Sequence, residues 1–310
     1  MILQVFILIL GFVMLVKGAD WFVEGAAGIA KKMGIPQLII GLTIVAMGTS
    51  MPEAAVSITA ALDGNAGITV GNIVGSNILN ILIILGITAV ITNVAVQKST
   101  LYCEIPFMTG ITVLLLIFGV TGNSITFAEG VVFWVLFLLF LGYLFVMAKR
   151  GQEQEEEAEA KDLPVWKCLV FMVLGGLLVV KGSDFAVSGA SEIARFFGMS
   201  DRLIGLTIVA LGTSLPELVT SVTAARKGNA GIAIGNIVGS NIFNILFVIG
   251  TTALICVVPF EQKFMIDTGI AILCGVLLWL GTVKHKELRR PCGIVMLVCY
   301  AGYLGYLLAV

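Results

Sequence analysis

The most constraining feature of this chain is a 46-residue stretch that occurs twice. The first copy spans Gly41–Gly86 and the second spans Gly205–Gly250, at an offset of 164 residues without gaps. The two copies are identical at 32 of 46 positions. Each copy is apolar but carries one glutamate, Glu53 or Glu217, directly after a proline. A carboxylate in such a segment is costly unless a cation meets it, so the repetition predicts two halves of a single cation site.

The composition admits one broad class of protein. Of the 310 residues, 59% are hydrophobic and only 12% are charged, whereas soluble domains carry about 25% charged residues. The chain is therefore expected to be a polytopic membrane protein. The net charge of −1 gives no sign of a surface for nucleic acid. Six scattered cysteines without a CxxC pair are typical of reduced, buried thiols.

Apolar segments predict an all-α membrane protein with ten transmembrane helices. The first segment lacks the basic start of a signal peptide, and its end, Val16–Ala26, matches Val180–Ala190 at the same offset, so we expect it to be retained. The first and sixth spans are the longest and are expected to be strongly tilted or to protrude. The approximate limits are 2–30, 38–62, 68–91, 103–120, 126–148, 166–196, 202–225, 231–257, 265–283 and 292–309.

The ten spans divide into two repeats of five. Residues 1–148 form the first repeat, residues 165–310 form the second, and residues 149–164 form an acidic linker between them. Because each half has an odd number of spans, the halves are inserted in opposite senses. Inverted repeats are typical of secondary transporters whose binding site lies at the middle of the membrane.

The distribution of lysine and arginine predicts the orientation. The loops that follow odd-numbered spans, together with the linker, carry most of these residues and are therefore expected to be cytoplasmic, with both termini outside. The opposite face carries only Arg195, Arg202 and Lys263. The cytoplasmic set is Lys31, Lys32, Lys98, Lys149, Arg150, Lys161, Lys167, Arg226, Lys227, Lys284, Lys286, Arg289 and Arg290.

The second and seventh spans are expected to be broken helices. Pro52 follows Gly48 by four residues and Pro216 follows Gly212, and a proline lacks the N–H that would bond the earlier carbonyl. Carbonyls left unpaired at this depth must be buried or must line a cavity. Hard oxygen donors with carboxylate charge suit Ca²⁺ or Na⁺. The candidate donors are the carbonyls near Ala46 and Ala210, the hydroxyls of Thr49, Ser50, Thr213 and Ser214, and the carboxylates of Glu53 and Glu217.

The next span in each half adds a polar helix face. Its members recur at i, i+4 and i+8, which places them on one side of a helix. They either complete the cation site or only bond neighbouring helices, and their duplication beside a broken helix favours the site. They are Asn72, Ser76 and Asn80 in the first half, and Asn236, Ser240 and Asn244 in the second.

Two further charged pairs lie in the long first and sixth spans. Lys17 and Asp20, like Lys181 and Asp184, are one helical turn apart. We expect each to be an internal ion pair that tolerates burial in the membrane. A role in gating is the alternative.

The paired G-T-S-x-P-E and G-N-x-x-G-S-N stretches resemble the alpha repeats of the cation/calcium exchanger superfamily, and within it the prokaryotic sodium/calcium exchangers. The resemblance implies that the first and sixth helices slide past the core to alternate access. It also implies a calcium site at Glu53 and Glu217 with Thr49 and Thr213. It implies one sodium site at Ala46, Thr49, Ser50, Glu53 and Ser240, another at Ala210, Thr213, Ser214, Glu217 and Ser76, and a centre completed by Asn80 and Asn244.

The expected function is Na⁺/Ca²⁺ antiport. Potassium-dependent relatives carry aspartate where this chain has Asn244, so we expect independence from potassium. Two ionised glutamates give the empty site a charge of −2. One Ca²⁺ or two Na⁺ would neutralise it, and three Na⁺ would leave +1. The residues alone leave this open, and the resemblance favours electrogenic exchange of three Na⁺ for one Ca²⁺.

Other functions receive less support. A proton/calcium antiporter, or one for another divalent cation, stays the alternative, because Glu53 and Glu217 can carry protons once calcium leaves. Intramembrane enzyme chemistry is disfavoured, since the chain has no HExxH motif and no histidine within a span. A channel is disfavoured by the inverted repeat. We therefore expect a carrier without a cofactor, acting as a monomer in a prokaryotic cell membrane.

Overall fold

The computed structural model describes residues 2–150, 163–199, 208 and 210–309 of the chain. Within these ranges the chain is helical, apart from short loops and four strands of two residues each. The expected all-α class is therefore confirmed. The acidic linker lies almost wholly outside the described residues, as does the start of the expected seventh span.

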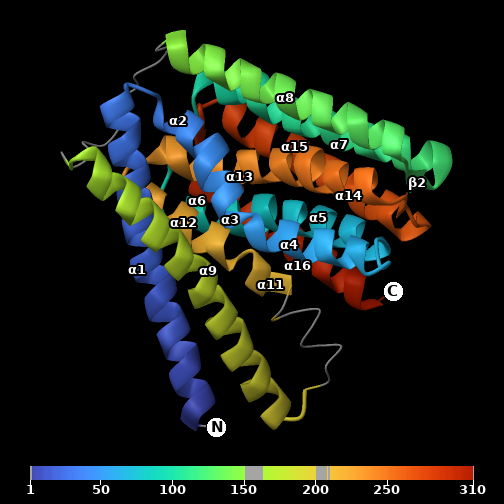
Figure 1. Ribbon diagram of the computed structural model, residues 1–310, viewed down its shortest axis with the longest axis horizontal. Coiled ribbons are helices and arrows are strands. Elements are labelled where there is room, and N and C mark those ends of the chain that lie inside the picture. Colours follow the sequence, from blue (N-terminus) through green and yellow to red (C-terminus); the bar gives the residue numbers. More distant parts are fainter. Residues whose placement is uncertain (1, 151–162, 200–207, 209, 310) are drawn as a thin grey trace.

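The first half contains long helices and a chain of shorter helical pieces (Figure 1). The pieces labelled η are turns of π-helix, which interrupt otherwise continuous spans. In order, the elements are α1 (Ile2–Met33), α2 (Gln37–Ile40), η1 (Gly41–Val45), α3 (Ala46–Thr49), α4 (Met51–Leu62), α5 (Gly67–Leu79), η2 (Asn80–Leu85), α6 (Gly86–Ile91), β1 (Val94–Ala95), η3 (Thr100–Glu104), α7 (Ile105–Gly122), β2 (Ser124–Ile125) and α8 (Phe127–Arg150).

The second half repeats this pattern. Its elements are α9 (Val165–Phe196), α11 (Ala210–Thr213), α12 (Leu215–Arg226), α13 (Ala230–Phe243), η5 (Asn244–Ile249), α14 (Gly250–Ile255), β3 (Val258–Pro259), α15 (Gln262–Val283), β4 (Glu287–Leu288) and α16 (Arg290–Ala309). The strands join the halves, because β1 pairs with β4 and β2 pairs with β3, both antiparallel.

The described part of the chain holds eight helices that are long and apolar enough to cross a membrane. A ninth span is the bent pair Gln37–Thr49 and Met51–Leu62, whose axes differ by 49°. The predicted break of the second span is thus confirmed at Ser50. Of the expected seventh span, the structure describes α11 and α12, which are separated at Ser214. A count of ten stays a prediction.

The two longest helices, α1 and α9, pack against each other at the edge of the molecule (Figure 1). Each has 32 residues, or about 48 Å of helix against a hydrocarbon layer of about 30 Å. Glycines bring the two backbones close together. A Cβ on Gly18 would lie 2.8 Å from the carbonyl oxygen of Gly175, and one on Gly175 would lie 2.5 Å from the amide nitrogen of Phe22. Such contacts are typical of helix packing within membranes.

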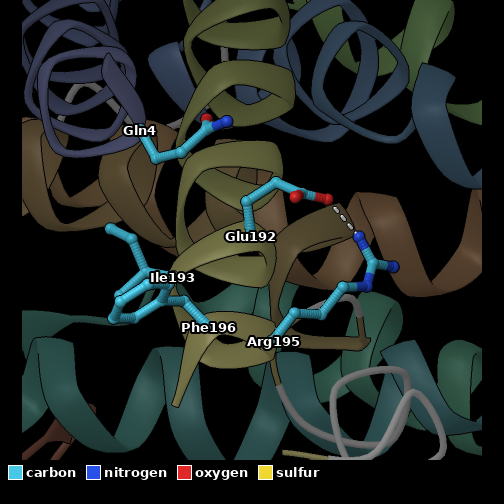
Figure 2. A pocket seen from close by; sticks show the side chains of 5 residues that line it. All are labelled: Gln4, Glu192, Ile193, Arg195 and Phe196. Atoms are coloured by element: carbon cyan, nitrogen blue, oxygen red, sulfur yellow. Dashed lines mark hydrogen bonds and ion pairs between the residues drawn. The ribbon is translucent and has the colours of Figure 1, made fainter. Parts of the chain in front are cut away.

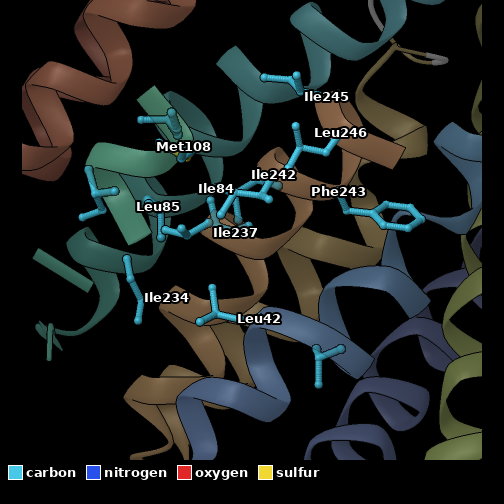
Figure 3. Packing of buried hydrophobic residues seen from close by; sticks show 14 of the residues in the cluster. Leu42, Ile84, Leu85, Met108, Ile234, Ile237, Ile242, Phe243, Ile245 and Leu246 are labelled. Atoms are coloured by element: carbon cyan, nitrogen blue, oxygen red, sulfur yellow. The ribbon is translucent and has the colours of Figure 1, made fainter. Parts of the chain in front are cut away.

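The centre of the molecule is formed by the two repeated spans. Helix α13 is buried along almost its whole length, and its isoleucines pack with residues from η1 and η2 (Figure 3). In contrast, α8 and α16 expose large apolar side chains such as Leu139 and Val298. An apolar exterior around a packed interior is the arrangement expected for helices surrounded by lipid.

Candidate ion-binding site

The two glutamates are positioned by the breaks in the repeated helices. Ser50 (φ −84°, ψ 6°) separates α3 from α4, and Ser214 (φ −93°, ψ 5°) separates α11 from α12. A proline opens each new helix, and Glu53 and Glu217 lie in the first turn after it. Both side chains are 1% exposed. The N-terminus of a helix carries partial positive charge, which favours a carboxylate at this depth.

Each carboxylate is held by a serine of the opposite half. Ser50 Oγ donates to Glu217 Oε1 at 2.8 Å, and Ser214 Oγ donates to Glu53 Oε1 at 3.3 Å. These four residues are thus brought together from segments about 160 residues apart in sequence. The two copies of the repeat contribute to a single buried cluster of oxygens.

The first asparagine of each polar helix face braces a helix break. Asn236 Nδ2 donates to Ser221 Oγ at 2.9 Å, and its Oδ1 accepts from Thr49 Oγ1 at 3.0 Å. In the other half Asn72 Nδ2 donates to Ser57 Oγ at 2.9 Å. These bonds fix α12 on α13 and α4 on α5 next to the glutamates. These bonds show that both asparagines bridge neighbouring helices beside the breaks.

Four asparagines form a network at the centre, where η2 and η5 begin. Asn77 and Asn241 exchange bonds, the amide nitrogen of each donating to the backbone carbonyl of the other at 3.2 Å. Their side-chain oxygens accept from Asn244 Nδ2 at 3.0 Å and from Asn80 Nδ2 at 2.9 Å, respectively. With both amide nitrogens engaged, the oxygens of Asn80 and Asn244 are fixed in orientation.

Asn77 and Asn241 were not singled out from the sequence. They lie one position away from the predicted i, i+4, i+8 faces. The available signal was their identity in both copies of the G-S-N motif. Only the structure reveals that they orient Asn80 and Asn244.

Four buried oxygens of this region have no hydrogen-bond partner. They are Glu53 Oε2, Glu217 Oε2, Asn80 Oδ1 and Asn244 Oδ1, two from each half. Buried polar atoms are normally satisfied, and carboxylate and amide oxygens are the ligands that Ca²⁺ and Na⁺ take in proteins. The arrangement therefore fits a hard cation as cargo. The described residues contain no group of three or more His, Cys, Asp or Glu that could hold a metal ion, so the donors of this region are two carboxylates together with amide and hydroxyl oxygens.

The expectation of unpaired carbonyls is wrong at Ala46. Its carbonyl oxygen accepts from the backbone N–H of Ser50 at 3.0 Å and from Ser240 Oγ at 3.4 Å. Gly212 is likewise engaged, since its carbonyl accepts from Ser183 Oγ at 2.6 Å. Hydroxyl groups of neighbouring helices therefore also bond the carbonyls near both breaks.

The remaining predicted residues occupy compatible places. Ser76 is buried on α5, one residue before Asn77. Thr213 is half-buried at the end of α11 and approaches the carboxyl of Glu53. Ala210 is the first residue of α11, and its side chain lies outside the described parts of the chain.

The ion pairs expected along α1 and α9 need correction. Asp20 does not pair with Lys17 but with Lys227, at the end of α12 (3.0 Å). Lys181 does pair with Asp184 at 3.2 Å, yet both side chains are more than half exposed, so this pair is not internal. The helical spacing allows an ion pair within each helix, but Asp20 pairs instead with Lys227, the residue that follows α12.

A hollow of 610 Å³ lies between α4, α9 and α11. Met51, Ala55, Asp184 and Thr213 are among the residues that line it, and we call it the α4–α9 hollow. It reaches the cluster at Thr213, whereas the equivalent Thr49 is 1% exposed. The α4–α9 hollow therefore approaches the cluster from the side of Thr213.

A second hollow, of 340 Å³, lies between the N-terminal end of α1 and the C-terminal end of α9 (Figure 2). It is lined by Gln4 and Phe196, and by Glu192 and Arg195, which pair with each other. None of the predicted site residues lines this hollow.

Apolar helices of membrane-spanning length around buried carboxylates define an integral membrane protein with an internal polar site. The model of the family described as sodium/calcium exchanger protein matches residues 3–146 and 167–309. The chain therefore belongs to the sodium/calcium exchanger family, within the cation/calcium exchanger superfamily, and the resemblance drawn from its motifs is confirmed. As a member of this family of transporters, it is a cation/calcium antiporter.

Individual relatives agree with this placement. CaxA of Alkalimonas amylolytica is 41% identical to this chain, with 98% of both chains covered. The sodium/calcium exchanger MaX1 of Methanosarcina acetivorans is 33% identical, with 96% of both covered. A solved structure of the sodium-calcium exchanger NCX_Mj, soaked with Na⁺ and Ca²⁺, is 33% identical and superposes with a TM-score of 0.85 over 98% of both chains.

Proposed function

We propose that this protein exchanges Na⁺ for Ca²⁺ by alternating access, with three Na⁺ for each Ca²⁺ and without potassium. The observation that carries the proposal is the set of four unpartnered oxygens at Glu53, Glu217, Asn80 and Asn244. Their two carboxylates match the charge of Ca²⁺, and their oxygen chemistry suits both ions.

The serine and threonine hydroxyls supply the flanking positions for Na⁺. Ser50 and Ser214 already contact the carboxylates. Ser240 lies at the Ala46 carbonyl, so that a sodium ion on this side would take the place of its hydrogen bond. The corresponding set on the other side is Ala210, Thr213, Ser214, Glu217 and Ser76.

The exchange then follows from charge and access. Ca²⁺ cancels the two carboxylates and leaves a neutral site. Three Na⁺ leave a charge of +1, which makes the exchange electrogenic. The two loads compete for the same carboxylates, so the release of one permits the binding of the other. Asn244 is neutral where an aspartate would add a charge for potassium, and this supports independence from potassium.

The overall plan that we propose is ten helices in two inverted repeats, 1–148 and 165–310. The abundance of lysine and arginine on one face supports a cytoplasmic linker at 149–164 and termini outside a prokaryotic cell membrane. We propose function as a monomer within the lipid bilayer, since the two repeats of a single chain supply both carboxylates of the site.

Glutamate variants test the shared site. In sodium-loaded liposomes, Glu53→Gln and Glu217→Gln should each reduce ⁴⁵Ca²⁺ uptake to the level of protein-free liposomes, because the remaining carboxylate cannot balance a divalent ion. Glu104→Gln is the matched control, since Glu104 is fully buried but lies outside the site. Robust uptake by either site variant would refute the proposal.

A further inference from the structure

The long helix pair meets the two halves of the core differently. On one side Leu215 and Val219 of α12 pack against a cluster that includes Leu15 and Ala19 of α1. At the offset of 164, the counterparts of Leu215 and Val219 are Met51 and Ala55 of α4, which line the open α4–α9 hollow. The α1–α12 interface is therefore closed while the α9–α4 interface is open.

Among the described residues, an ion pair crosses the closed interface and none crosses the open one. Lys227 Nζ lies 3.0 Å from Asp20 Oδ1 and donates to the Asp20 carbonyl at 3.0 Å. The counterpart of Asp20 is Asp184, and the counterpart of Lys227 is Asp63. Two carboxylates cannot form such a pair, and Asp184 bonds Lys181 on its own helix instead.

The packing of α1 and α9 against the helix breaks does not account for this difference. Phe22 of α1 is buried, and its ring lies 3.2 Å from where a Cβ of Gly48 would be, beside Thr49. In the other half a Cβ on the counterpart glycine, Gly212, would meet the side chain of Val187 of α9, so both breaks are packed. The feature that distinguishes the closed interface is therefore the ion pair of Asp20 and Lys227.

We propose that Asp20 and Lys227 are positioning residues that hold the α1–α12 interface closed and so favour the state in which the site opens beside α4 and α9. The inference rests on the proposed function, because alternating access in inverted repeats exchanges the conformations of the two halves. In the opposite state the α9–α4 interface closes, and Asp184 approaches Asp63 without attraction. The pair is about one third exposed, so it shifts the ratio of the two states by up to about fivefold.

The test compares two introduced cysteines. Ala55→Cys reports the α4–α9 hollow, and its counterpart Val219→Cys reports the interface that is closed here. Each is labelled in liposomes with a membrane-impermeant maleimide applied to both faces, and the chain without the added cysteine is the blank for native thiols. The ratio of the Val219→Cys rate to the Ala55→Cys rate follows the balance of the two states.

Lys227→Ala should raise this ratio about two- to fivefold. The charge-swapped pair Asp20→Lys with Lys227→Asp should restore it. Asp63→Lys, at an exposed position, should also raise the ratio, because it offers Asp184 a partner in the opposite state. An unchanged ratio in Lys227→Ala and Asp63→Lys would overturn the proposal. Labelling requires no ion transport, so failure of this inference can be distinguished from failure of the proposed Na⁺/Ca²⁺ exchange.

Discussion

The orientation of Asn80 and Asn244 depends on two other asparagines. Asn77→Leu removes the acceptor of Asn244 Nδ2 and the bond to the carbonyl of Asn241. Hydrogen bonds of this kind contribute about 0.5–1.5 kcal/mol each. We expect the half-saturating Ca²⁺ concentration of uptake to rise about tenfold in Asn77→Leu.

The control for this prediction is Asn65→Ala, whose side chain is exposed in a loop after α4. It should leave the half-saturating concentration unchanged. A wild-type value in Asn77→Leu would mean that Asn77 does not position the site.

At the scale of residues, the identity of the charged site residues could be predicted from the sequence better than the partners of their hydrogen bonds and ion pairs. The cost of a buried carboxylate indicated Glu53 and Glu217, and both lie in one cluster. The pairing of Asp20 with Lys227 was not predictable, because it joins positions 207 residues apart. Local spacing favours Lys17, whereas the packing of α1 on α12 decides the partner.

A half-buried hydrogen bond outside the ion site joins η3, at the base of α7, to α8. Tyr143 Oη donates to Glu104 Oε1 at 2.5 Å, and Glu104 is the fully buried last residue of η3. Tyr143→Phe leaves this carboxyl without its donor, which should cost about 1–3 kcal/mol of stability. A lower midpoint of thermal unfolding in detergent would show it.

Glu104→Gln is the companion variant, because its amide oxygen still accepts the tyrosine proton. It should unfold close to the wild-type midpoint. If Tyr143→Phe also unfolds at the wild-type midpoint, the bond does not stabilise the packing of η3 against α8.

The close contact of α1 and α9 depends on glycine. In Gly18→Ala the new Cβ would lie 2.8 Å from the Gly175 carbonyl, and this overlap forces the helices apart. We expect destabilisation of about 1–3 kcal/mol, measured as a lower unfolding midpoint.

Gly110→Ala is the matched substitution, because a Cβ there meets nothing within 4 Å. It should leave the midpoint unchanged or slightly higher, since alanine favours helix. Equal midpoints for both variants would contradict the role of Gly18 in packing.

Among the elements, length and apolarity were sufficient to predict most spans. The expected span 103–120 corresponds to Thr100–Gly122, and 265–283 corresponds to Gln262–Val283. Proline chemistry predicted the bend at Ser50. The π-helical turns and the short strand pairs were not predictable, because they arise where segments from different halves pack together.

For the whole molecule, the charge of the load predicts a response to voltage. Exchange of three Na⁺ for one Ca²⁺ moves one net charge, worth about 2.3 kcal/mol per 100 mV across the full field. For entry of one Ca²⁺ against exit of three Na⁺, positive charge leaves, so an inside-positive potential should speed uptake.

Potassium and valinomycin set that potential, and the rate is compared with that at zero potential. An uptake rate independent of potential would instead indicate exchange of two Na⁺ for each Ca²⁺.

The most direct measurement of the central claim is ⁴⁵Ca²⁺ uptake by the purified wild-type protein in sodium-loaded liposomes diluted into sodium-free buffer, with pH clamped by an ionophore. The account predicts uptake that requires internal sodium and persists under the clamp. Uptake that ignores sodium but follows an imposed pH gradient would contradict it and would identify a proton/calcium antiporter.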